Sequence, residues 1–145
     1  MMRRLPLLIG LAGMLGACSG RNRYEPVAPR PPFRCYAILA DTGSPEFLVS
    51  EIVLGTNVLF SDLKAAAVRS GGPGTTGKLG AQWRGIGADS IEVQWSRPGT
   101  MFGPVGILLG EVRGDSLDGR SAAGSDIIPI GPGVHVHGHT VSCAP

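Results

Sequence analysis

The feature that most constrains this chain is a strict alternation of apolar and polar side chains between Ser90 and Ser96. The apolar residues occupy the odd-numbered positions, Ile91, Val93 and Trp95. The polar residues occupy the even-numbered positions, Glu92, Gln94 and Ser96. A period of two is typical of a β-strand with one buried face, because successive side chains point to opposite faces of a sheet. Turn residues flank the segment. The stretch from Leu79 to Ser125 therefore predicts an antiparallel meander of three or four strands.

The same interpretation extends over most of the chain. We expect further strands before and after this meander, and the full set is 34–40, 47–55, 79–85, 90–96, 104–113, 116–124 and 134–143. Residues 61–70 are ambiguous, with a short strand slightly favoured over a helix capped by Ser61. Residues 71–77 predict a loop, and residues 127–133 a Pro-Gly connection. High Gly and Pro content with few charged residues fits many turns and short strands better than long helices.

The first residues have the features of an export signal. Arg3 and Arg4 precede an apolar run that is too short to span a bilayer as a stable helix. The run ends at Leu15-Gly16-Ala17-Cys18, which resembles the bacterial lipobox. The resemblance implies that residues 1–17 are a signal peptide and that Cys18 becomes lipidated. An ordinary secretory signal with a chance Cys is the alternative. An Asp directly after the Cys would resemble an inner-membrane retention signal, so Ser19 at that position favours the outer membrane.

Residues 18–32 predict a lipidated, disordered tether, since they contain four prolines and no apolar periodicity. Residues 33–145 are then the folded domain. From Cys35 onward, seven basic side chains stand against ten acidic ones, which gives a net charge of about −3. This balance argues against a nucleic-acid surface, which needs clustered basic residues.

Two cysteines remain once Cys18 is assigned to lipid, and they lie in the first and last predicted strands. A bond between Cys35 and Cys143 can form in an oxidising compartment and would join the two edge strands. Edges are removed when a sheet closes on itself. We therefore expect an all-β fold, a single small antiparallel up-and-down β-barrel of seven to eight strands. A β-sandwich is the alternative that the same pattern allows.

Several segments resemble a group of small bacterial secreted proteins and lipoproteins with no established activity. The segments are Arg34-Cys35-Tyr36-Ala37, Gly87 to Ser96, Gly114 to Gly119 and the late Cys. The resemblance implies one domain and says nothing about function. The meander also looks like lipocalin-like or avidin-like barrels, in architecture alone, because the Gly-x-Trp of true lipocalins is missing.

Gly114-Asp115-Ser116-Leu117 resembles the nucleophile block of GDSL esterases. Those enzymes place the block after the first strand of an α/β fold and activate the Ser with a His. Here it falls late, between two predicted strands. Ala88-Asp89-Ser90-Ile91 has the same form and also opens a strand, so a turn explains both copies better than a hydrolase does.

Asp41-Thr42-Gly43-Ser44 resembles the catalytic turn of retroviral-type aspartic proteases. A chain with one copy would act as a homodimer in which two Asp41 carboxylates share a proton. Ala40 and Pro45 depart from the family pattern, and a hairpin turn is the favoured interpretation.

His135, His137 and His139 alternate near the C-terminus. On a strand the three imidazoles face the same way, about 6.5–7 Å apart, and a His-x-His pair can chelate Zn²⁺ or Cu²⁺. One ion cannot take all three without bending the strand, and Asp126, Glu111 or a residue of a partner strand are candidates for a further ligand. The alternative, which we favour, is the polar outer face of an ordinary strand.

Taken as a whole, the sequence predicts a membrane-tethered envelope protein with a non-catalytic binding or structural barrel, and a homodimeric aspartic protease as the alternative. A small apolar ligand or another envelope component is the expected partner. The aromatic and apolar residues expected to line or fill the barrel interior are Tyr36, Trp83, Trp95, Phe102 and Leu109.

Overall fold

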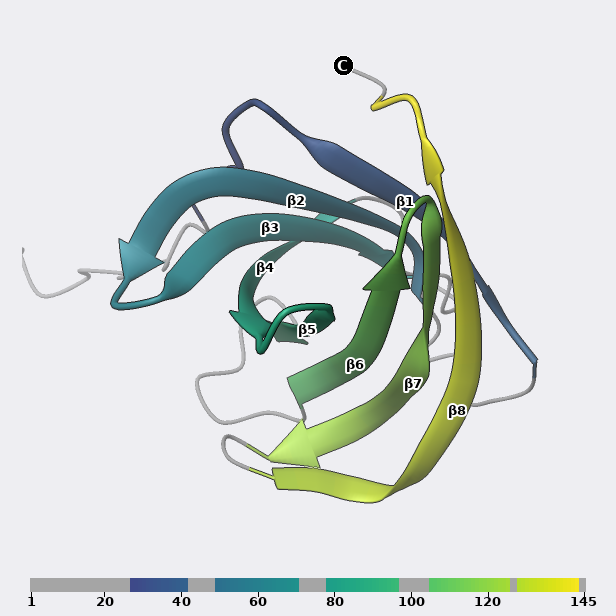
Figure 1. Ribbon diagram of the computed structural model, residues 1–145. Helices are drawn as coiled ribbons and strands as arrows, with labels where there is room; N and C mark the ends of the chain where they lie inside the picture. The colour runs from purple at the N-terminus through teal and green to yellow at the C-terminus, as the bar shows by residue number, and fades with distance from the viewer. Residues whose placement is uncertain (1–26, 42–48, 71–77, 97–104, 126–127, 144–145) are drawn as a thin grey trace, which may run out of the picture.

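The computed structural model describes residues 27–41, 49–70, 78–96, 105–125 and 128–143. These residues form eight antiparallel strands: β1 (Arg34–Ala40), β2 (Val49–Phe60), β3 (Leu63–Ser70), β4 (Lys78–Ile86), β5 (Ser90–Ser96), β6 (Val105–Arg113), β7 (Ser116–Ser125) and β8 (Ile128–Val141). Each strand pairs with the next, and β8 pairs back onto β1, so the sheet is a closed barrel (Figure 1). The up-and-down barrel predicted from the sequence is confirmed, and the sandwich alternative is wrong. No helix of the described residues is long and apolar enough to cross a membrane.

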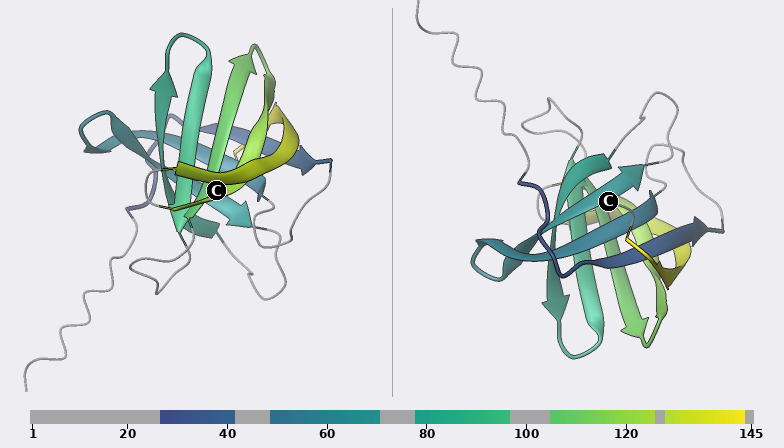
Figure 2. Two further views of the ribbon diagram at one scale, coloured as in Figure 1. Left: turned by 90° about the horizontal axis from the view of Figure 1, so that it is seen from below. Right: turned by 90° about the horizontal axis from the view of Figure 1, so that it is seen from above.

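Figure 2 shows how the barrel is shaped: β1, β2 and β3 run crosswise to β4, β5, β6 and β7. One end of the barrel carries tight turns, at residues 61–62, 87–89 and 114–115. Gly87 and Gly114 open two of these turns with φ of 69° and 59°, a region that Gly enters without steric cost. The connections at the other end lie outside the described residues.

The inward-facing side chains form one continuous apolar cluster. The residues with the largest fully buried side chains are Tyr36, Ile52, Leu54, Val68, Val93, Leu108, Leu117 and Val136. Trp95 is also buried, and Trp83 packs against the cluster while its Nε1 donates to the carbonyl oxygen of Gly55 at 2.9 Å. The described strands thus fill the barrel with side chains, as expected for eight strands.

Gly106 gives Trp95 its space. A Cβ atom at Gly106 would lie 2.1 Å from Cε2 of the Trp95 indole, so the ring packs directly on the β6 backbone. The two residues are cross-strand partners in the β5–β6 ladder. A glycine in mid-strand is thereby explained by close packing rather than by a turn.

Leu109 does not line the interior, contrary to the sequence prediction. Leu108 is fully buried, whereas Leu109 is 41% exposed on the outer face. Neighbouring residues of a strand point to opposite faces, and an unbroken apolar run does not reveal which one turns inward. Phe102 lies outside the described residues.

Residues 63–70 are a strand, which decides the ambiguity of this segment. Three successive alanines, Ala65, Ala66 and Ala67, are all buried within β3. Their small side chains fit between the neighbouring elements on both faces. Because residues 63–70 pair with β2 and β4 as a strand, the helix alternative is wrong. Ser61 has a positive φ of 52° and lies in the turn instead of capping a helix.

β8 begins at Ile128, six residues before the predicted start, and includes the predicted Pro-Gly connection. Among the described residues its first part pairs only with β7, because the β1–β8 register ends at the pair Ala40–Val136. Pro129 and Pro132 therefore lie where β8 is an edge strand, and a missing backbone N–H is tolerated there. β2 also runs longer than predicted, to Phe60.

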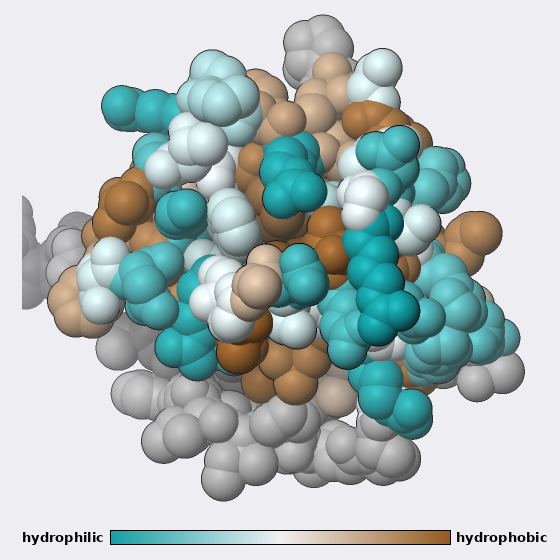
Figure 3. Space-filling model, viewed as in Figure 1, coloured by the Kyte–Doolittle hydropathy of each residue, from teal (hydrophilic) through white to brown (hydrophobic). Residues whose placement is uncertain are grey.

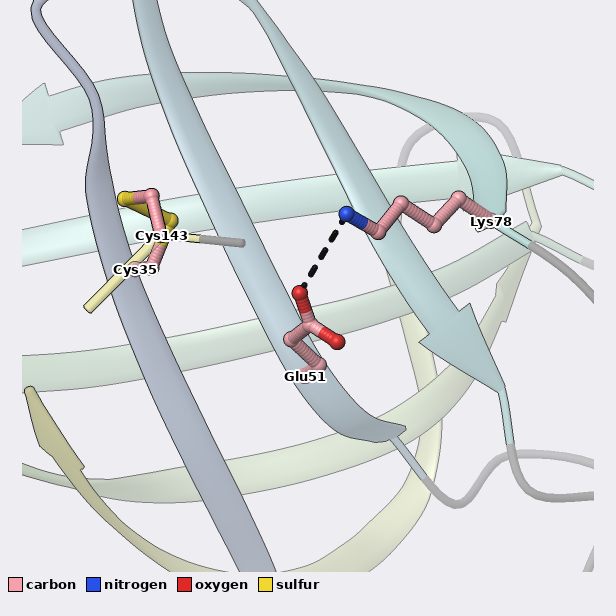
Figure 4. Close-up of a disulfide and its surroundings, with 4 residues drawn as sticks. All are labelled: Cys35, Glu51, Lys78 and Cys143. Atoms are coloured by element: carbon pink, nitrogen blue, oxygen red, sulfur yellow. Dashed lines mark ion pairs between the residues drawn. A yellow bond between two sulfur atoms is a disulfide. The ribbon is translucent and has the colours of Figure 1, made fainter. Parts of the chain in front are cut away.

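The predicted disulfide is present between Cys35 and Cys143, whose Cα atoms are 5.3 Å apart. It lies on the outer face of the barrel, where Val53 and Ala67 pack beside it (Figure 4). Cys143 follows the end of β8, so the covalent bond joins the first and last strands at the point where the barrel closes.

An ion-pair cluster lies on the same outer face, near the disulfide in Figure 4. Glu51 of β2 contacts Arg69 of β3 at 3.2 Å and Lys78 of β4 at 3.4 Å. Such exposed pairs each contribute at most about 1 kcal/mol. They fit a sheet whose outer positions are solvated.

The segment 28–31, which we call the N-terminal strap, is bonded to β2. The backbone N–H of Arg30 donates to Asn57 Oδ1 at 2.7 Å, and the N–H of Thr56 donates to the Arg30 carbonyl at 3.1 Å. The hydrogen bonds of the barrel with the preceding chain therefore begin before residue 33, the predicted start of the folded domain.

Gly55 allows the strap to lie against β2. A Cβ atom there would come within 2.6 Å of Pro29 Cβ and 2.9 Å of the Arg30 nitrogen. The absence of a side chain at this position is what lets the two backbones approach.

Candidate Asp-His site on the outer face

The outer face of β8 carries the three histidines. His135, His137 and His139 alternate with inward-facing residues, and Val136 between the first two is buried. The alternation predicted from the sequence is thus present, and all three imidazoles lie outside the barrel.

Strand pairing brings two aspartates to these histidines. β1 ends at Ala40, and the N–H of Asp41 donates to the His135 carbonyl at 3.1 Å, which continues the β1–β8 ladder by one residue. Asp118 of β7 is directly opposite His137 in the β7–β8 register. Three segments distant in sequence therefore contribute to one cluster.

His135 lies between the two carboxylates. Its Nδ1 is 3.0 Å from Asp41 Oδ2, and its Nε2 is 2.6 Å from Asp118 Oδ1. His137 packs edge to face against His135, with 4.2 Å between ring centroids, and its Nε2 is 3.6 Å from Asp41 Oδ1. We call Asp41, Asp118, His135 and His137 the Asp-His cluster.

The two carboxylates favour the charged form of His135. The hydrogen bond to Asp118 is the largest cause, and the bond to Asp41 the next, of a pKa for His135 that is raised above its usual 6.5. In its protonated form the imidazolium donates one N–H to each carboxylate, so both hydrogen bonds are satisfied at once. The two carboxylates therefore make protonation of His135 easier than that of an isolated imidazole.

Three members of the cluster have the geometry of metal ligands. One donor atom each from Asp41, His135 and His137 lies within 4.8 Å of the others. His139 is exposed and is not part of this group, so the predicted three-histidine set is only partly brought together. Glu111, a predicted further ligand, pairs with Arg113 at 2.6 Å, and Asp126 lies outside the described residues.

A groove of about 830 Å³ runs along the outer face of β5 to β8 next to the cluster. Its outward-facing lining combines apolar, basic and acidic side chains: Ile86, Leu109, Arg113, Arg120, Glu111, Asp118, Ser116 and His135. In the view of Figure 3, apolar side chains are scattered among polar ones in separate small areas. The outward-facing side chains that line the groove are thus mixed in character.

No family model, no curated protein and no solved structure matches this chain.

The two enzyme motifs differ in what the structure shows of them. Ser116 begins β7 directly after a turn, and the Asp115 carbonyl accepts from the N–H of Thr140 at 2.8 Å. The Asp89 carbonyl in the other copy accepts from the N–H of Val112 at 2.6 Å. Both copies therefore lie in a turn that leads into a strand, and no hydrogen bond among the described residues joins Ser116 to a histidine.

Residues 42–44 of the protease-like motif lie outside the described residues, as does Cys18. Asp41 itself is described, and its carboxylate faces His135 and His137. Asp118 was missed in the sequence, although its position two residues after Ser116 on an alternating strand placed it on the outer face.

Proposed function

We propose that this chain is a lipid-anchored envelope protein of the outer membrane whose β-barrel is a non-catalytic binding or structural module. The observation that carries the proposal is the Cys35–Cys143 disulfide, which joins the first and last strands. Such bonds persist in oxidising compartments, where the export signal and lipobox-like segment would direct the chain.

Burial supports a module that works through its outer surface. The inward positions of the described strands form one apolar cluster, while the ionisable groups of the Asp-His cluster and the groove lie outside. A small apolar ligand in the barrel would have to displace that cluster. Another envelope component bound at the groove would not, and we favour it as the partner.

The surroundings of Asp41 favour this function over an aspartic protease. A homodimeric protease needs two Asp41 carboxylates close enough to share a proton. In this chain the Asp41 carboxylate is 3.0 Å from His135 Nδ1 of the same chain, so a second Asp41 could approach it only if this imidazole moved away.

The anchor is tested by metabolic labelling with a fatty acid. The unaltered chain should take up label, and Cys18→Ser should not, while Ser19→Ala serves as the matched control and should label normally. Ser19→Asp should keep the label and move the protein from the outer to the inner membrane. Label that persists in Cys18→Ser would overturn the lipid anchor.

A further inference from the structure

We propose that Asp41, His135 and His137 bind one divalent transition-metal ion of the Zn²⁺ class on the outer face of the barrel. This inference stands on the cluster geometry and is independent of the lipid anchor. The proposed function places binding on the outer surface of the barrel, and the ion is a ligand for that surface.

The spacing of the donor atoms fits such an ion. Ligands at about 2.0–2.1 Å in a tetrahedral zinc site lie roughly 3.3–3.4 Å from one another. Asp41 Oδ2 and His135 Nδ1 are 3.0 Å apart, and Asp41 Oδ1 and His137 Nε2 are 3.6 Å apart. These two distances involve different oxygens of Asp41, and one donor atom from each residue lies within 4.8 Å of the others, so the three side chains would draw closer together around an ion.

The types of donor also fit. Two imidazoles and one carboxylate, with no thiolate, suit Zn²⁺ and the neighbouring divalent ions. Both described cysteines are joined in the disulfide and cannot compete. Three protein ligands leave a fourth position for water or for a donor from another molecule.

Asp118 is a positioning residue in this arrangement. Its Oδ1 is 2.6 Å from His135 Nε2, the ring nitrogen that does not face Asp41. A carboxylate that accepts a hydrogen bond from the second nitrogen of a ligating His fixes the tautomer and the ring orientation. The arrangement thus leaves His135 Nδ1 to bind the ion.

The side chains are accessible to an ion from solvent. His135 and His137 are 40% and 51% exposed, and Asp41 is 57% exposed. Substitutions at these positions should leave the apolar cluster of the barrel intact, so that loss of binding is not loss of folding.

His139 provides a matched control. It is the third outward-facing histidine of β8, but it lies outside the group of close donor atoms. If any His-x-His pair on β8 could bind the ion, the pair His137–His139 would serve as well as the pair His135–His137. The cluster depends on Asp41 instead.

The test is calorimetry with ZnCl₂ on the full chain in detergent, disulfide intact. One ion should bind per chain with a Kd tighter than about 10 μM. His135→Ala, His137→Ala and Asp41→Ala should each weaken binding by more than about 100-fold, and Asp118→Asn by about 10- to 100-fold. His139→Ala should leave the Kd within about twofold, since it removes no donor from the cluster.

Two further measurements distinguish the roles. In ¹⁵N spectra, Zn²⁺ should shift the His135 Nδ1 resonance and leave His139 unchanged, and Asp118→Asn should alter the His135 tautomer signal in the metal-free chain. Thermal melting should move upward with ZnCl₂ in the unaltered chain and in His139→Ala, because a ligand that binds the folded state stabilises it. Absence of saturable binding, or an equal loss from His139→Ala, would overturn the proposal.

Discussion

At the scale of single residues, the outer face of β8 carries the histidines of the Asp-His cluster. His135 is held by two carboxylates from different strands, with nitrogen–oxygen distances of 3.0 and 2.6 Å. By contrast, the polar atom of Tyr36 lies inside: its hydroxyl is buried and has no hydrogen-bond partner among the described residues. These two residues give predictions of opposite kinds.

The protonation of His135 should be shifted toward higher pH in the metal-free chain. Because its pKa is raised by Asp118 first and Asp41 second, its NMR titration midpoint should lie above 6.5. Asp118→Asn should lower that midpoint more than Asp41→Asn does. Glu111→Gln, which removes a groove carboxylate that pairs with Arg113, is the control and should have far less effect.

The same shift fixes the sign of the pH dependence of stability. A group with a raised folded-state pKa stabilises the fold fully below its unfolded pKa of about 6.5 and loses that contribution as the pH rises through the folded value. The difference in unfolding free energy between the unaltered chain and His135→Ala should therefore shrink above pH 6.5. A difference that grows with pH would contradict the two-carboxylate arrangement.

Removal of the Tyr36 hydroxyl should not destabilise the barrel. A buried hydroxyl without a partner costs about 1–3 kcal/mol, so Tyr36→Phe should leave the urea unfolding free energy unchanged or raise it by about 1 kcal/mol. Tyr36→Ala, which also empties the ring site, should lower it by about 3–5 kcal/mol. A clear loss in Tyr36→Phe would mean that the hydroxyl has a partner in the folded protein.

At the scale of strands, glycines decide where side chains and backbones approach closely. Gly106 makes room for the Trp95 ring, and Gly55 makes room for the N-terminal strap. Gly85 of β4 is different, since a Cβ there would meet its nearest neighbour, the Ser90 carbonyl oxygen, at 4.0 Å.

Gly106→Ala and Gly85→Ala should thus have different effects. The first forces the Trp95 ring to move and should lower the unfolding free energy by about 1–3 kcal/mol. The second should be neutral or stabilise by up to about 1 kcal/mol, because it reduces the entropy of the unfolded chain. Chemical denaturation followed by Trp fluorescence measures both, and equal losses would contradict the packing described for Trp95.

The strands could be predicted from the sequence wherever alternation was clear. The interval 90–96 has a strict period of two, and its predicted bounds are those of β5. Prediction failed where pairing decides: β8 includes two prolines because part of it has no β1 neighbour. The Asp-His cluster depends on the register of β1, β7 and β8, which alternation within one strand does not contain. Asp118 was therefore missed, and the sequence did not reveal that His139 lies outside the group of close donor atoms.

At the scale of the whole molecule, the barrel is closed in two ways, by the β1–β8 ladder and by the Cys35–Cys143 bond. The ladder is made of backbone hydrogen bonds and needs no cysteine. The barrel should therefore stay closed when the disulfide is reduced, but its free energy of unfolding should fall.

Loss of the bond should act mainly through the unfolded chain. The cysteines are 108 residues apart, and the chain-entropy model gives a contribution of about 4–5 kcal/mol for a loop of this size. The Cys35→Ser, Cys143→Ser double variant should keep its β-sheet circular dichroism and lose most of that amount in urea unfolding. A double variant that lacks β-sheet at low temperature would show that the ladder alone does not close the barrel.

The most direct test is mass spectrometry of the native chain, isolated without reductant from the cells that produce it and then digested. We expect the spectrum to contain a peptide pair linked through Cys35 and Cys143, and an N-terminal peptide that begins at a lipidated Cys18. Free thiols at residues 35 and 143, or a chain that retains residues 1–17 with an unmodified Cys18, would contradict a disulfide-closed barrel tethered in the envelope.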